Sequence, residues 1–195
     1  LVKTFVFQTF IFLYIKIFIN KKNYYKNSKL TFIDTFVTLN KKLNEGFYPI
    51  ISNKINKTVV FVPTIVQTLR FYKLIKLIRE IDKSNYLFKE HYLTFSDLFF
   101  SFFHFYRKKK FLKNTYNYKK YDLSRLVYEE INDLKDYNSI VVGILNFNFF
   151  KNIANSLKVK KSINWFENQV IDRGWNLGFR TFFKNSTKSS RKLQQ

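Results

Sequence analysis

The sequence predicts an α/β protein in which helices cover both faces of a parallel sheet. Two segments, 57–63 and 139–145, are continuously apolar and rich in β-branched residues, as strands are when both faces of a parallel sheet are buried. A helix with one apolar face is predicted directly after the first segment. The length of 195 residues suits one domain with a single core.

The first strand is predicted in residues 29–40. Its apolar run, Leu30–Ile33, is closed by Asp34, a residue type that favours the start of a helix. We therefore expect the strand to enter a helix at this point. That helix is expected to end near Asn44, before a glycine and a proline.

The second strand, Lys57–Pro63, is expected to lead into a strongly two-sided helix. Thr64 and Gln67 fit a capping box, with Thr64 as the N-cap residue. Apolar side chains then recur on one face of the helix and cations on the other. The predicted apolar face comprises Phe71, Leu74, Ile75, Ile78 and Ile81, and the opposite, solvated face carries Arg70, Lys73, Lys76, Arg79 and Lys83. A short strand is predicted next, at Ser84–Phe88.

A helical hairpin is predicted at about residues 95–136. Thr94 and Asp97 fit an N-terminal cap for its first helix, Phe95–Phe111. The second helix, Asp122–Asp136, holds the largest cluster of acidic residues in the chain, and the loop between the helices is basic and rich in tyrosine. An apolar stem of this kind can pack in the protein while its cationic tip contacts phosphates.

The last third of the chain predicts a compact strand–helix–strand unit followed by a tail. Ser139–Leu145 is predicted as a strand, Phe150–Leu157 as a helix and Val159–Trp165 as the next strand, with a right-handed crossover. From Arg173 onward hydrophobic periodicity and acidic residues disappear, which is typical of a disordered basic tail. The expected divisions are an N-terminal segment at 1–28, an α/β RNA-binding domain at 29–172 and the tail at 173–195.

Charge and residue types exclude several classes of protein. The 35 lysines and arginines exceed the 13 acids by 22 charges, and such an excess favours a polyanionic partner. The absence of cysteine excludes disulfides and thiolate sites. His91 and His104 are the only histidines, and no glycine-rich phosphate loop follows either predicted buried strand. We therefore expect no enzymatic activity, no cofactor and no metal.

The amino-acid composition and the N-terminal segment indicate where the protein is located in the cell. Phenylalanine, with 25 residues, and tyrosine, with 13, are abundant, whereas glycine and proline are rare. This bias towards A/T-rich codons is typical of an organelle genome and favours a mitochondrial, organelle-encoded protein. Residues 1–19 are apolar but interrupted by Lys3, Gln8 and Lys16, so no membrane span is expected.

The predicted phosphate-binding residues lie in four separate groups, as suits contacts along a folded RNA. The N-terminal group is Lys21, Lys22, Lys26 and Lys29. The hairpin group is Arg107, Lys108, Lys109, Lys110, Lys113, Lys119 and Lys120. The group on the last predicted strand is Lys160 and Lys161. The tail group is Arg173, Arg180, Lys184, Lys188, Arg191 and Lys192.

The order and spacing of several segments carry a resemblance to a known family. The segments are Leu30–Asp34, Lys57–Thr64, Leu93–Phe95 and Tyr137–Leu145, followed by residues 153–163. In this order they resemble the "hIIDL", "GkiLFVGTk", "LTN" and "lPdlivvlD" segments of the family of small-subunit ribosomal protein two. The resemblance implies a Rossmann-like parallel sheet with an inserted helical hairpin, and a place in the small subunit between rRNA and neighbouring proteins. Pro63 stands where the family has a glycine.

The sequence thus supports one main hypothesis and two alternatives. The main one is a structural constituent of the small subunit of the mitochondrial ribosome in the matrix, whose partners are small-subunit rRNA and adjacent ribosomal proteins. The first alternative is an accessory subunit of an inner-membrane respiratory or ATP-synthase complex, with residues 1–19 at the membrane. The second is a degenerate nucleotide-binding enzyme.

Overall fold

A three-stranded parallel sheet lies at the centre of the fold, so the α/β prediction is confirmed. The computed structural model describes residues 2–22, 29–37, 58–65, 70–82, 86–111, 113–132, 137–164 and 170–183. The strands are β1 (Lys29–Phe36), β2 (Val59–Thr64) and β5 (Lys158–Ile163), in the order β2-β1-β5. β1 pairs in parallel with both neighbours, and Ile33 lies opposite Phe61 and Ile163.

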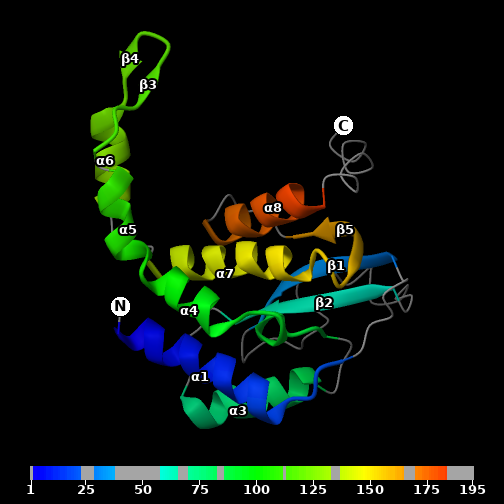
Figure 1. Ribbon diagram of the computed structural model, residues 1–195. Helices are drawn as coiled ribbons and strands as arrows, with labels where there is room; N and C mark the ends of the chain where they lie inside the picture. The colour runs from blue at the N-terminus through cyan, green and yellow to red at the C-terminus, as the bar shows by residue number, and fades with distance from the viewer. Residues whose placement is uncertain are drawn as a thin grey trace.

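Helices cover both faces of this sheet (Figure 1). Helices α7 (Tyr137–Ile153) and α8 (Val170–Phe182) lie on one side, and α1 (Val2–Phe18) and α3 (Phe71–Asp82) lie on the other. Alternate strand residues point to opposite faces. Accordingly, Phe32 belongs to the hydrophobic cluster under α7 and α8, and its neighbour Ile33 to the cluster under α1 and α3.

The two-sided helix is confirmed as α3, with a small rotation of its buried face. Leu74, Ile78 and Ile81 are buried as predicted, and Leu77 is buried with them. Phe71, predicted on the apolar face, is 49% exposed because it lies in the first turn of the helix. The solvated basic face is confirmed for the described cations, since Arg70, Lys73, Lys76 and Arg79 are exposed.

The two helix starts predicted at Asp34 and Thr64 are wrong, because both residues lie inside strands. The Thr64 hydroxyl donates a hydrogen bond to Asp34 Oδ1 at 2.9 Å, so the two polar side chains bind each other across neighbouring strands. α3 begins later, at Phe71. Gln67 and the helix expected up to Asn44 fall outside the described residues.

The strand predicted at Ser139–Leu145 is also wrong, because residues 137–153 form one helix, α7. The helix is apolar on nearly every side because it is enclosed by the sheet, by α8 and by α4 (Phe95–Phe102). A short apolar run does not distinguish a strand from a buried helix. The strand–helix–strand unit predicted here is therefore not formed, and one segment that carried the family resemblance is helical. The following strand is confirmed as β5.

The tail predicted from Arg173 is wrong over its first part, which belongs to helix α8. Ile171, Trp175 and Phe179 recur at every fourth position and are buried, so a helical period was present. The glycines at 174 and 178 obscured this helical period in the sequence. In the structure they allow α8 to lie close to α7, since a Cβ atom on Gly174 would lie 2.6 Å from Gly143 Cα. Residues 184–195 lie outside the described part of the chain.

The N-terminal segment is the helix α1, and it is built into the body of the protein. Its residues Ile11 and Ile15 are fully buried, and Phe12 joins the cluster on the other face of the sheet. Across the described ranges, none of the helices combines the length and apolarity needed to cross a bilayer.

The hairpin region forms an arm that projects from the body (Figure 1). Its base is α4, which packs on α7, and its projecting part contains α5 (His104–Phe111), the strands β3 (Asn117–Tyr118) and β4 (Tyr121–Asp122), and α6 (Ser124–Asn132). The predicted cap is confirmed: Thr94 and Asp97 form a reciprocal capping box at the start of α4. The single helix expected at Phe95–Phe111 is interrupted at Phe103, where α4 ends.

A short connection, η1 (Lys89–His91), links the body to the arm. Just before it, Tyr86 makes one parallel bridge to Phe61 of β2. Of the strand predicted at Ser84–Phe88, the described residues form this one bridge. Ser84 itself lies outside them.

Candidate nucleic-acid interface

The tip of the arm is a two-stranded hairpin that presents two lysines between two tyrosines. Tyr118 pairs with Tyr121, and Lys119 and Lys120 form the turn. Lys119 adopts a left-handed conformation with φ 55°, which closes the turn tightly. The rings of Tyr118 and Tyr121 are 62% and 58% exposed. Each lysine ammonium lies 5.5 Å from the ring of the adjacent tyrosine.

Hydrogen bonds at the base of the hairpin hold this tip in place. The Leu123 amide donates to the Tyr116 carbonyl at 2.7 Å, and the Tyr116 amide donates to Ser124 Oγ at 2.9 Å. The Tyr128 hydroxyl of α6 donates to the Asn114 carbonyl at 2.6 Å. The tip is therefore presented on a braced support, although little of it is buried.

The cations of α5 have different surroundings. Lys110 and Lys113 are exposed, and the Arg107 guanidinium stacks 3.5 Å above the Phe100 ring. Lys108 is only 7% exposed, so little of this residue is accessible to a partner. The Lys109 side chain is outside the described part of the structure. The arm therefore presents cations near its base and at its tip.

A second group of cations lies along the edge of the sheet. β5 is an edge strand, and Lys158 on it lies opposite Lys29 of β1. Lys29, Lys158 and Lys160 are exposed, and Lys161 is half-buried. Lysines on an edge strand also discourage pairing with strands of other molecules. Protection of the sheet edge is therefore the simplest alternative to phosphate binding for this group.

The N-terminal cations make contacts within the protein. The Lys21 ammonium lies 4.2 Å from the Tyr92 ring. Lys22 Nζ donates to the Asp82 carbonyl oxygen at 2.8 Å, and partial burial lowers the pKa of Lys22. Lys22 therefore has a structural role, whereas Lys21 remains exposed. Lys26 is outside the described residues.

Of the predicted tail group, the structure describes Arg173 and Arg180. Both are exposed on α8, two turns apart on the same face of the helix. The remaining predicted residues, Lys184, Lys188, Arg191 and Lys192, are outside the described ranges. The described cations thus form separate groups on the arm, the sheet edge and α8.

A buried polar network at the carboxyl ends of β1 and β2 was not predicted as a unit. Lys89 Nζ donates to Asn146 Oδ1 at 2.8 Å and to Thr64 Oγ1 at 3.4 Å, and Thr64 donates to Asp34. All four side chains are at most 3% exposed. Burial raises the pKa of Asp34 to about 6 and lowers that of Lys89.

This network lies where open α/β sheets place ligands, but its burial leaves the side chains enclosed in the core. Lys89 and Asn146 come from η1 and α7, far apart in sequence, so no local motif identified them. In the described ranges, no three histidine, aspartate or glutamate side chains come together as a metal site.

Comparisons with known proteins found no match to the chain. No family model matches it, and neither a curated protein nor a solved structure shows detectable similarity. Its function must therefore be inferred from its own residues.

Proposed function

We propose that the chain is a structural, non-enzymatic constituent of the small subunit of the mitochondrial ribosome, where it binds rRNA. The observation that carries the proposal is the braced arm with the sequence Tyr118–Lys119–Lys120–Tyr121 at its exposed tip. Ammonium groups bind phosphates, and exposed aromatic rings provide faces on which unpaired bases stack. The excess of 22 positive charges favours the same class of partner.

The separation of the cationic groups also supports a folded RNA as the partner. Cations at the tip of the arm, on the sheet edge and at Arg180 of α8 can contact phosphates that are distant along the RNA, whereas a groove-reading module concentrates its contacts on one element. In this proposal the sheet is a Rossmann-like scaffold without a phosphate loop. The resemblance to small-subunit ribosomal protein two stays a prediction, based on the segments that form β1, β2 and β5 and on Leu93–Phe95.

The first prediction concerns the tip lysines. The double variant Lys119→Ala/Lys120→Ala is expected to weaken binding to transcribed mitochondrial small-subunit rRNA. The slope of log K against log salt is expected to become shallower by about 1.5, since each lost phosphate contact removes about 0.7–0.9. Fluorescence anisotropy at several salt concentrations measures both quantities. The control is Lys73→Ala/Lys76→Ala, which removes two exposed cations from α3. Equal slopes for the two double variants would contradict a role for the tip.

The second prediction concerns the tip tyrosines. Tyr118→Ala and Tyr121→Ala are each expected to weaken RNA binding about tenfold, because stacking of one base contributes about 1–3 kcal/mol. The matched variants Tyr118→Phe and Tyr121→Phe keep the ring and are expected to bind within about twofold of the wild type. If the phenylalanine variants are as weak as the alanine variants, the rings do not stack on bases.

The assignment to the ribosome itself is tested by sedimentation. In a sucrose gradient of a mitochondrial extract at moderate salt, the native chain is expected to co-sediment with small subunits. Release of the chain at high salt is expected, because counterions compete with lysines for phosphates. A chain that stays at the top of the gradient at moderate salt is not a ribosomal constituent. Its retention in carbonate-washed membranes would instead favour the membrane-complex alternative.

A further inference from the structure

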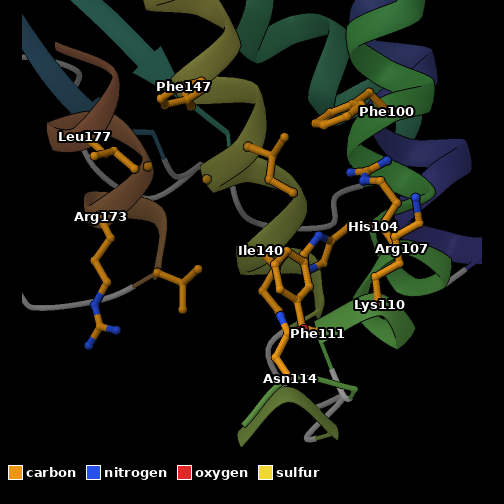
Figure 2. Close-up of a pocket in the computed structure, with 14 residues that line it drawn as sticks. Phe100, His104, Arg107, Lys110, Phe111, Asn114, Ile140, Phe147, Arg173 and Leu177 are labelled. Atoms are coloured by element: carbon orange, nitrogen blue, oxygen red, sulfur yellow. The ribbon is translucent and has the colours of Figure 1, made fainter. Parts of the chain in front are cut away.

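An open apolar groove lies between the arm and α8 (Figure 2). α7 forms its floor, α4 and α5 form one wall, and α8 forms the other. The groove has a volume of about 730 Å³. On the floor, Ile140, Ile144 and Phe147 are half-buried. Their spacing of four and then three residues forms one stripe along the helix, which is the pattern that contacts a second helix.

The walls leave large apolar side chains uncovered. Phe100 and Phe111 on the arm side are 51% and 48% exposed, and Leu177 of α8 is 59% exposed. Contiguous exposed apolar residues of this kind mark an interaction surface. Gly143 and Gly174 also line the groove, where the backbones of α7 and α8 are in direct contact.

The charged residues that line the groove all have one sign. Arg107 and Lys110 lie on the arm wall and Arg173 on α8, and no carboxylate is among the lining residues of this described site. Stacking on Phe100 holds Arg107 in place. The groove therefore combines an apolar floor with cations on both walls.

We propose that this groove binds an acidic amphipathic helix of a neighbouring protein. The apolar face of that helix packs on Ile140, Ile144 and Phe147, while acidic side chains at its edges pair with Arg107, Lys110 and Arg173. This is the helix-in-groove mode of recognition, in which anchors at positions i, i+3 or i+4, and i+7 enter an apolar groove. The surface is distinct from the tip of the arm, so the chain can hold rRNA and a protein at the same time.

The same features argue against other occupants. Residues 184–195 of the chain are basic and polar, so their charge matches that of the groove rather than complementing it. A second copy carries the same excess of 22 positive charges and is repelled at long range. The floor residues Ile140 and Ile144 are aliphatic and offer no ring on which a base of RNA can stack. A single fatty acyl chain has one anionic group, whereas the cations stand on both walls.

A synthetic peptide tests the proposal directly. The probe is a fluorescein-labelled 18-residue helix with leucines on one face and glutamates along both edges, titrated with the full chain in 150 mM salt. Two matched peptides replace either the leucines by serine or the glutamates by lysine. We expect both replacements to weaken binding at least tenfold, because the groove offers apolar contact and positive charge together.

Paired variants of the chain locate the binding surface. Arg173→Glu in the groove and Arg180→Glu, two turns further along α8 and outside it, change the net charge equally. Leu177→Glu in the groove and Leu126→Glu on α6 replace leucines of similar exposure, 59% and 63%. We expect the two groove variants to weaken peptide binding at least fivefold. The two controls are expected to bind within twofold of the wild type.

Several results overturn the proposal. Equal weakening by Arg173→Glu and Arg180→Glu shows that the peptide senses only overall charge. Unchanged binding of the serine peptide shows that the groove floor is not used. Displacement of the peptide by dodecanoate or by phosphatidylglycerol vesicles, sensitive to Leu177→Glu, assigns the groove to a lipid. Dimerisation that Leu177→Glu abolishes assigns it to a second copy. None of these results bears on RNA binding by the tip.

Discussion

The variant Lys89→Met is expected to lower the free energy of unfolding by about 3–5 kcal/mol at pH 7, the range found when one partner of a buried charged pair is removed. Lys89 is 3% exposed and donates to Asn146 and Thr64. Without it, two acceptors lose their donor and Asp34 loses the nearby positive charge. Urea unfolding followed by circular dichroism measures the change. The control Lys73→Met removes an exposed lysine and is expected to cost less than about 0.5 kcal/mol.

The pH dependence of this loss identifies its cause. Burial raises the pKa of Asp34 from 3.8 to about 6, so between these values the folded state holds a proton that the unfolded state has released. The contribution of Asp34 to stability is therefore present at acidic pH. It falls by about 3 kcal/mol as the pH rises through this window. Relative to Asp34→Asn, which cannot ionise, the wild type is expected to lose stability from pH 4 to pH 7.

The Lys89→Met variant is expected to be less destabilised at pH 5 than at pH 7, because Asp34 is neutral at the lower pH. The double variant Asp34→Asn/Lys89→Met is expected to lose less stability than the sum of the single variants. A loss that is independent of pH and strictly additive would show that Lys89 contributes packing rather than charge.

The variant Gly174→Ala is expected to cost more than about 3 kcal/mol, because α7 and α8 must separate to accept one methyl group. A Cβ atom at this position would lie 2.6 Å from Gly143 Cα and would overlap the Gly143 carbonyl. These are backbone atoms, so no side-chain rotation relieves the overlap. Thermal and urea unfolding measure the loss.

Gly178→Ala provides the matched control one helical turn away. There the added methyl group would lie 3.0 Å from a ring atom of Phe150 and 3.0 Å from Phe147 Cα, so the neighbours need to shift by a few tenths of an ångström, less than at Gly174. Replacing glycine by alanine inside a helix is favourable by about 1 kcal/mol. Gly178→Ala is therefore expected to be close to neutral. A loss close to zero at Gly174 would mean that α7 and α8 are not in close contact there.

The residues of the two proposed sites were predictable to different degrees. Lys119 and Lys120 belong to a run of positive charge, so the sequence predicted them as phosphate-binding residues, whereas Tyr118 and Tyr121 belonged to a tyrosine-rich loop and were assigned no role. The pairing of Tyr118 with Tyr121 depends on a tight turn at Lys119. The turn was not predicted, because neither of its two residues is a glycine or an asparagine. The groove was not predicted, because its lining residues come from the arm, α7 and α8 and converge only in three dimensions.

The sequence by itself determined β1, β2, β5, the buried face of α3 and the capping box at Thr94, because each depends on residues close together in the chain. Only the tertiary structure decided that 139–145 is helical and that Asp34 and Thr64 lie within strands. An apolar run can be buried as either a strand or a helix, and a polar residue after such a run can cap a helix or bind a distant partner. Which alternative forms depends on the neighbours that packing supplies: α8 and α4 around α7, and Lys89 beside Thr64.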